Sequence, residues 1–342
     1  MIRIGRPQVA SVAESAYPKA RVSVDDETAR RYIAKTAVLK NFAWQTSVDY
    51  PPAAGRIRLL GPVSDAVLPC AGAVGTGMSS GVDSFYTVMT HGANTPRPLT
   101  HLTYYTAFSL VPFGSTDVVK TFDAIDKIFD EEVRHASEVT SALGLTFVPV
   151  RTNLDRDFCR GGMIYSGMYR SLASTLALGK LLGTYYSSSS GHGRDLGVRI
   201  IAQTQNYEHL ICDSCQTETL TYINSDDVLR TEKLRLLADN PLFRRHMSVC
   251  YHLCACGECL GCWKTMFPLD ILGKLDLFGD VFDLPRYYAR REELLRSFVS
   301  YAMKPGQESL KVTLEQLVRL AESESGDSAV RFRELLRTAM MA

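Results

Sequence analysis

The sequence predicts an α/β protein built on a doubly wound parallel sheet. Short apolar stretches that are typical of buried strands recur from about residue 72 onward, and long segments with the apolar spacing of helices separate them. Strands joined through helices pair in parallel, and the helices then cover both faces of the sheet. Ligands of such sheets bind beyond the carboxyl ends of the strands, so we expect the functional residues there.

The first seventy residues do not follow this alternation. Short β-rich pieces are interrupted by "YPPAAG" and "GPVSD", which predicts a small β-rich or α+β appendage over residues 1–69. The sheet domain should follow over residues 70–280, and a helical extension over residues 281–342.

The sheet domain should begin with a strand at about residues 72–78 and a helix that starts at Asp83. The next strands are "LTHLTYYTAF", "LTFVPV" and "TYYSSSS". "MYRSLASTLALGKLLG" is the helix before the last of them. The long helix between the first two of these strands carries one apolar stripe, formed by Phe122, Ile125, Phe129, Val133, Ala136 and Val139.

Beyond Phe278 the pattern predicts three helices, at about residues 285–303, 308–323 and 328–341. In "SLKVTLEQLVRLAE" the apolar side chains share one face of the helix. We therefore expect this tail to pack on the core or on another subunit, as in a homodimer.

Composition sets the class of protein. The chain has 342 residues, of which 46% are hydrophobic, so it can bury a sizeable core. Lys and Arg number 38 against 37 Asp and Glu, and this balance gives no general electrostatic reason to expect nucleic acid or an anionic membrane as partner. The beginning of the chain has no apolar core of a signal peptide, so we expect a cytoplasmic protein. Its nine cysteines are then expected as thiols, metal ligands or catalytic groups.

A short polar motif, "SSGVDS", lies where the first predicted strand gives way to the first helix. Gly81 lets main-chain N–H groups approach a ligand, and the start of the helix supplies unsatisfied N–H donors. The hydroxyls of Ser79, Ser80 and Ser84 add further donors, which favours phosphate as the ligand. Asp83 fits beside phosphate when Mg²⁺ bridges the two, because this cation prefers oxygen ligands. The alternative is that these residues only cap the helix.

This motif resembles the S-G-G-x-D-S loop of the PP-loop ATP pyrophosphatases, which cleave ATP to AMP and pyrophosphate while they adenylate a substrate oxygen. Ser80 stands where the first glycine of that loop is usual. The resemblance extends over about residues 70–280 and implies a sheet of the adenine nucleotide alpha-hydrolase type. It also implies that ATP is bound, with Mg²⁺ near the aspartate, by Ser79, Ser80, Gly81, Asp83 and Ser84.

Five of the nine cysteines fall in the segment "CYHLCACGECLGCWKT". The overlapping C-x-x-C units put Cys256, Cys259 and Cys262 within reach of one ion, and either Cys250 or Cys254 could complete a tetrahedron. Four thiolates with no open position form a structural zinc site. An iron–sulfur cluster and a set of buried thiols are the alternatives.

The cysteine segment resembles the zinc segment of the 7-cyano-7-deazaguanine synthases, which are PP-loop enzymes. This resemblance favours Cys250 as the fourth zinc ligand, with Cys256, Cys259 and Cys262. The chain is also similar to longer bacterial PP-loop proteins at "LTHLTYYTAF", "VPVRTNL", "LRTEKLRLLA" and "CWKTMFPLDILGKLDLF".

The helix expected in "VLRTEKLRLLADNP" should bury apolar side chains such as Leu236 and Leu237, and helical cations usually face water. Its "RTEK" is similar to PP-loop relatives, however, and this similarity implies that Arg230 and Lys233 neutralise the charge that develops as pyrophosphate leaves.

Candidate substrate contacts lie between the two motifs. "YYSSSSGHGRD" ends a predicted strand and "YEHLICDSCQTET" follows it, although serines in a loop can also be ordinary turn residues. Cys212 and Cys215 form a lone C-x-x-C, which we interpret as buried thiols. The candidate residues are Ser189, Ser190, His192, His209 and Asp213.

The resemblance implies ATP-dependent adenylation of a carboxylate or amide oxygen of a small molecule or peptide. Ammonia or another amine then displaces AMP to give an amide, an amidine or a nitrile. ATP, Mg²⁺ and Zn²⁺ are the expected cofactors. Two alternatives remain open: sulfur transfer, which needs an iron–sulfur cluster or a redox-active cysteine such as Cys159, and a nucleotide-binding protein without turnover.

Overall fold

The structure is a computed structural model that describes residues 67, 69–105, 118–152, 171–189, 212, 216–250, 255–305 and 307–341, with the backbone alone at 118–128 and 308–309. The chain divides into two compact units. The sheet unit comprises residues 1–78, 87–111 and 115–226, and the helical unit comprises residues 79–86, 112–114 and 227–342. Except for residues 67 and 69, the appendage expected over residues 1–69 lies outside the described residues.

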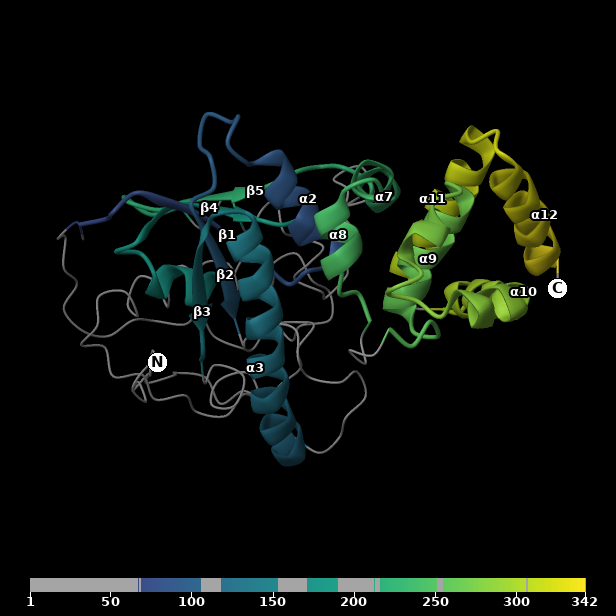
Figure 1. Ribbon diagram of the computed structural model, residues 1–342, viewed down its shortest axis with the longest axis horizontal. Coiled ribbons are helices and arrows are strands. Elements are labelled where there is room, and N and C mark those ends of the chain that lie inside the picture. The colour runs from purple at the N-terminus through teal and green to yellow at the C-terminus, as the bar shows by residue number, and fades with distance from the viewer. Residues whose placement is uncertain are drawn as a thin grey trace, which may run out of the picture. The chain divides into compact units, whose positions relative to one another are not determined.

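The sheet unit contains five parallel strands in the order β3-β2-β1-β4-β5, which confirms the α/β class and the parallel sheet (Figure 1). Four strands lie where the sequence predicts them, whereas the fifth, β5, is not predicted. The strands are β1 (Ala73–Gly77), β2 (His101–Tyr105), β3 (Thr146–Val150), β4 (Leu182–Ser187) and β5 (Thr221–Asn224).

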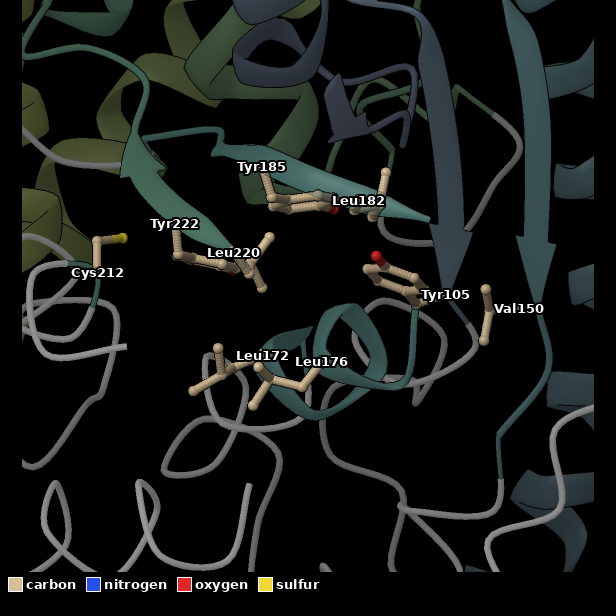
Figure 2. Close-up of a cluster of buried hydrophobic side chains, with 9 residues drawn as sticks. All are labelled: Tyr105, Val150, Leu172, Leu176, Leu182, Tyr185, Cys212, Leu220 and Tyr222. Carbon is tan, nitrogen blue, oxygen red and sulfur yellow. The ribbon is translucent and has the colours of Figure 1, made fainter. Parts of the chain in front are cut away.

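One face of the sheet packs on the helix at residues 171–177. Figure 2 shows Leu172 and Leu176 of this helix pointing toward the tyrosines of the sheet. Tyr105 is anchored to the helix through its hydroxyl group, which lies 3.1 Å from Thr175 Oγ1. The buried cluster on this face consists of Tyr105, Val150, Leu172, Leu176, Leu182, Tyr185, Cys212, Leu220 and Tyr222.

Two other helices cover the opposite face: the end of α2 (Val82–Thr90) and α3 (Val118–Ala142). Neighbouring residues of a strand point to opposite faces, so Tyr104 contacts α3 while Tyr105 contacts the helix at 171–177. The rings of Tyr104 and Phe129 lie 5.7 Å apart, and His91, just after α2, stacks on Tyr186 of β4 at 3.8 Å. Figure 1 shows α3 lying across this face of the sheet.

The long helix follows the predicted stripe where its side chains are described. Phe129, Ala136 and Val139 are buried, and Val133 is half-buried. The side chains of Phe122 and Ile125 lie outside the described part of the structure.

The helical unit is built around α9, whose Phe267 is fully buried. The ring of Phe267 packs against Phe298 of α10 and Phe332 of α12, each at 5.7 Å between ring centroids. The three predicted C-terminal helices are confirmed. The elements of this unit are α7 (Arg230–Leu237), α8 (Pro241–His246), α9 (Leu260–Ile271), η2 (Leu275–Phe278), α10 (Leu284–Ala302), α11 (Glu308–Ser323) and α12 (Asp327–Met341).

Asp270 of α9 ties α10 to the centre of the helical unit. The Tyr287 hydroxyl donates to its carboxylate at 2.9 Å, and Arg291 lies 3.1 Å from the same oxygen. Asp270 and Tyr287 are buried, so this contact fixes α9 in one position relative to α10.

Among the described helices, none combines the length and the apolar character that a membrane span requires.

Candidate functional site

The motif at residues 79–84 comprises the end of the loop after β1 and the first residues of α2, and it belongs to the helical unit. Ser80 adopts a left-handed backbone conformation, with φ of 56°, and its side chain is buried. Its carbonyl oxygen accepts a hydrogen bond of 2.8 Å from the Ser248 N–H. Glycine reaches this conformation without strain, which is a physical reason for a glycine at this place in the PP-loop pattern.

We expect Ser80→Gly to be more stable than Ser80→Ala by about 1 kcal/mol, because both variants lose the hydroxyl group and only alanine keeps the left-handed strain. The same pair of substitutions at Ser297, which is exposed inside α10, serves as the control, since there alanine should be the more stable by about 1 kcal/mol. Urea denaturation measures both differences. A preference for alanine at both positions would contradict the strained conformation of Ser80.

The hydroxyl groups of the loop turn toward one another. Ser79 Oγ lies 3.3 Å from Ser84 Oγ, and Ser84 donates a bond of 3.0 Å to the Gly81 carbonyl oxygen. Gly81 is not left-handed, and a Cβ atom added there would meet only Ser79 Oγ at 3.4 Å and the Ser248 carbonyl oxygen at 3.8 Å. Both are ordinary contacts, so steric crowding within the described chain does not require a glycine at position 81. A ligand that approaches this backbone closely would require it.

Asp83, in the first turn of α2, is the centre of an ion-pair cluster. Arg230 Nη1 lies 2.8 Å from one carboxylate oxygen, and Lys233 Nζ lies 3.1 Å from the other. The two cations come from α7, 147 and 150 residues away in the chain. The structure thus brings together Asp83, Arg230 and Lys233, which are the three predicted catalytic residues.

The burial of α7 follows the sequence pattern at Leu237 but not at two other positions. Leu237 is buried as expected, whereas Leu236 is 64% exposed, so the expectation that Leu236 packs inside is wrong. Lys233 is only 1% exposed and departs from the general rule that helical cations face water. Lys233 is stabilised inside by Asp83 and by the ring of Tyr86, whose centroid lies 5.3 Å from Nζ.

A third cation, Lys264 of α9, contributes to the same electrostatic environment. Burial alone would raise the pKa of Asp83, but the charges of Arg230, Lys233 and Lys264 outweigh burial and hold this pKa below its usual value. Burial and the neighbouring Arg230 lower the pKa of Lys264 to about 8, so it is mostly charged at neutral pH. Asp83 therefore pairs directly with two cations, and the charge of a third also acts on it.

Arg230 also contacts α9 directly. Its Nη2 atom lies 3.5 Å from the Oγ1 atom of Thr265, which is fully buried and donates to the Gly261 carbonyl oxygen. The Nε atom of Arg230 is buried and has no hydrogen-bond partner. A buried donor without a partner is costly, and a bound oxyanion would satisfy it.

Four cysteines gather at the start of α9: Cys250, Cys256, Cys259 and Cys262. Their sulfur atoms all lie within 4.8 Å of one another, so the group can hold a metal ion such as zinc. The distances are 3.6 Å from Cys250 to Cys256, 3.6 Å from Cys259 to Cys262 and 3.9 Å from Cys259 to Cys250. In a tetrahedron with Zn–S bonds of about 2.3 Å, neighbouring sulfur atoms lie about 3.8 Å apart, so this spacing fits zinc.

The backbone around the cluster makes tight turns of the kind that surround a metal ion bound by cysteines. Ala255 and Gly257 are left-handed, with φ of 48° and 71°. The N–H groups of Cys256 and Glu258 donate to cysteine sulfur atoms at 3.4 Å, which stabilises thiolate charge. Trp263 Nε1 closes the turn with a bond of 3.1 Å to the Gly257 carbonyl oxygen.

Two thiols of the cluster, those of Cys256 and Cys262, resist ionisation without a metal. Burial raises the pKa of Cys256 to about 11, and the hydrogen bond with Cys259, together with burial, raises the pKa of Cys262. A bound divalent ion supplies the positive charge that four thiolates need, so its binding releases protons. Cys254, the other candidate for the fourth ligand, lies outside the described residues.

Of the predicted substrate contacts, the structure describes only Ser189. This residue belongs to the sheet unit, where it is buried and its N–H group donates to Ser225 Oγ at 3.3 Å. Five other candidates named from the sequence lie outside the described residues: Ser190, His192, His209, Asp213 and Cys159.

Two residues of the site were not found from the sequence: Lys264 and Thr265. Both lie in "CWKT", which begins at Cys262, but nothing in a single lysine–threonine pair indicates that Lys264 acts on Asp83 or that Thr265 contacts Arg230. Their place in the site follows only from the position of α9 in the structure.

Comparisons of this chain with protein-family models, curated proteins and solved structures find no match.

Proposed function

We propose that the loop at residues 79–84 and the cations around Asp83 bind ATP, and that the chain uses it to adenylate a carboxylate or amide oxygen and then transfers nitrogen to the activated carbon. The observation that carries this proposal is the charge of the site. Two cations pair with one carboxylate in the first turn of a helix, the charge of a third acts on the same carboxylate, and the loop offers hydroxyl and N–H donors.

A polyphosphate matches this charge. The triphosphate of ATP keeps a net negative charge even with one bound Mg²⁺, so it gains from several fixed cations at once. The start of α2 adds the positive end of a helix dipole. The resemblance of "SSGVDS" to the PP-loop ATP pyrophosphatases, and the position of the loop directly after β1, where the strand order reverses, support the same ligand.

Each residue would have a distinct role in binding. Ser79, Ser84 and the backbone at Gly81 would donate to phosphate oxygens. Arg230 and Lys233, which form ion pairs with Asp83 in the structure, would bind the negatively charged phosphates. Asp83 would hold Mg²⁺, whose contribution is to neutralise phosphate charge.

The first chemical step is an attack of the substrate oxygen on the α-phosphorus. The P–O bond to the β-phosphate breaks and pyrophosphate leaves with the bonding electrons. Negative charge therefore grows on the departing oxygen, where Arg230, Lys233 and Lys264 would stabilise it. Correct placement of the two reactants can lower the barrier by roughly 7–11 kcal/mol, so this step needs no further catalytic side chain.

The second step replaces AMP by nitrogen. Ammonia or an amine attacks the activated carbon, the carbon–oxygen bond to AMP breaks, and the nitrogen loses a proton. A carboxylate gives an amide. When an amide is adenylated in a second round, addition of ammonia and departure of AMP give an amidine, whereas departure of AMP and one proton from nitrogen, with no ammonia added, gives a nitrile.

The identity of the phosphorus products tests the proposal. In ³¹P spectra of the zinc-loaded chain with Mg²⁺, ATP, ammonium and a panel of carboxylates, we expect AMP and pyrophosphate. Formation of ADP and phosphate would contradict cleavage at the α-phosphorus. A requirement for a sulfur donor in place of ammonium would favour sulfur transfer.

A matched pair of glycine variants tests the place of binding. Gly81 directly precedes α2 and Gly326 directly precedes α12, and a Cβ atom fits at both. We expect Gly81→Ala to weaken ATP binding at least about tenfold, because its methyl group fills the space of a phosphate, while both variants lose no more than about 1 kcal/mol of stability. Equal ATP affinity in the two variants would place the nucleotide elsewhere.

A further inference from the structure

The four cysteines come from two segments of the helical unit, and each segment touches a different part of the proposed phosphate site. Cys250 closes a segment whose Ser248 N–H holds the Ser80 carbonyl oxygen at 2.8 Å. Cys259 and Cys262 begin α9, which carries Thr265 to Arg230. The loop at residues 79–84 and Arg230 are therefore each connected to the four-cysteine cluster through one short segment.

The distances along the chain are short. Ser248 lies two residues before Cys250, and Thr265 lies three residues after Cys262 on the same side of α9, about 4.5 Å along the helix axis. A shift of Cys250 therefore reaches Ser248, and a shift of Cys262 reaches Thr265, through no more than three residues of backbone.

The start of α9 depends on the cysteines. Cys259 occupies the position before the first helical residue and makes no side-chain capping hydrogen bond. The opposite end of α9 is fixed by the contacts of Asp270 with Tyr287 and Arg291. In the first turn, which precedes Lys264 and Thr265, Trp263 packs on Phe298 of α10 at 6.2 Å between ring centroids. The cysteine cluster joins this turn to the segment that carries Ser248, and four thiolates at the N-terminus of a helix also complement the helix dipole.

We propose that a metal ion bound by the four cysteines acts as a clamp that joins the loop at residues 79–84 to Arg230 and α9, so that metal occupancy sets the affinity of the site for polyphosphate. This inference rests on the proposed function, because it concerns the same site. With the metal bound, Thr265 holds Arg230 and Lys264 contributes its charge. When the metal is lost, the two segments separate and the cations no longer converge. Thr265 is then a positioning residue, which acts on the phosphates through Arg230.

Inorganic pyrophosphate is the probe for the experiment, since it needs no second substrate. Calorimetric titration of the whole chain should show binding at least about tenfold weaker after removal of the metal by a chelator. Circular dichroism of the same samples shows whether the stripped chain remains folded. Thr265→Val, which has the same shape but cannot accept from Arg230, should weaken binding in the metal-loaded chain and have little further effect in the stripped chain.

A cobalt-substituted chain covers the case in which the stripped protein unfolds. Co²⁺ held by thiolates has a visible absorption spectrum that depends on the positions of the sulfur atoms, so pyrophosphate binding should change this spectrum. In Thr265→Val the change should be much smaller, although the variant binds the same amount of Co²⁺.

The outcomes separate this inference from the function on which it rests. Equal pyrophosphate affinity with and without metal, or a cobalt spectrum that pyrophosphate does not alter, would overturn the clamp and leave the ATP site standing. Absence of pyrophosphate and ATP binding in the fully metal-loaded chain would overturn the proposed function, and the clamp with it.

Discussion

Replacement of Cys262 by serine is expected to lower the free energy of unfolding of the zinc-loaded chain by at least about 3 kcal/mol and to abolish stoichiometric zinc binding. Cys262 is fully buried and lies 3.6 Å from Cys259, so a serine removes one of four ligands and leaves the others with an incomplete site. Urea denaturation and elemental analysis measure the two effects.

Cys212→Ser is the matched control. Cys212 is also fully buried, but it belongs to the core of the sheet unit (Figure 2) and is not one of the four clustered cysteines. This variant should keep one zinc per chain and lose only about 1 kcal/mol for the burial of a hydroxyl group. Loss of zinc from both variants, or from neither, would mean that the four-cysteine cluster is not the metal site.

Lys233→Met is expected to weaken ATP binding about 100-fold while the chain remains folded. Methionine fills the buried space of the lysine stem without its charge, and Asp83 keeps its ion pair with Arg230 at 2.8 Å. The phosphates, in contrast, lose a cation that lies in a buried site, where its charge is poorly screened by water. Calorimetric titration with ATP and Mg²⁺ measures the affinity, and thermal unfolding measures the stability.

Lys274→Met provides the comparison for this change. Lys274 is a lysine of the same unit with its own carboxylate partner, Asp239, and that carboxylate is 70% exposed. Its loss should leave ATP affinity unchanged. If the two methionine variants bind ATP equally, Lys233 is a structural cation and not part of the nucleotide site.

The alternation of strands and helices was readable from the sequence because each element is long enough to show its period. β1 to β4 and the three C-terminal helices lie where the apolar spacing places them. β5 escaped prediction because its four residues, "TYIN", are too few to show alternation, and only pairing with β4 makes them a strand.

The candidate site was predictable where several of its residues lie close together in one short sequence motif. The cysteine spacing identified Cys256, Cys259 and Cys262 and left two candidates for the fourth ligand, of which the family resemblance favoured Cys250. The structure brings these four sulfur atoms within 4.8 Å of one another. Asp83 also meets the two cations of α7 that the resemblance indicated. The burial of Lys233 and the exposure of Leu236 were not predictable, because helix periodicity assigns charge to the outside. The partner that reverses this assignment, Asp83, lies 150 residues away in sequence. Separation along the chain also hides the role of Thr265, which lies 35 residues after its partner Arg230.

Calorimetric titration of the zinc-loaded chain with ATP and Mg²⁺ tests the central claim most directly, because it requires no knowledge of the acceptor. We expect one ATP to bind per chain, pyrophosphate to compete with it, and Lys233→Met to weaken both. Absence of ATP binding at millimolar concentration, or binding that neither Lys233→Met nor Gly81→Ala affects, would contradict a nucleotide site at Asp83.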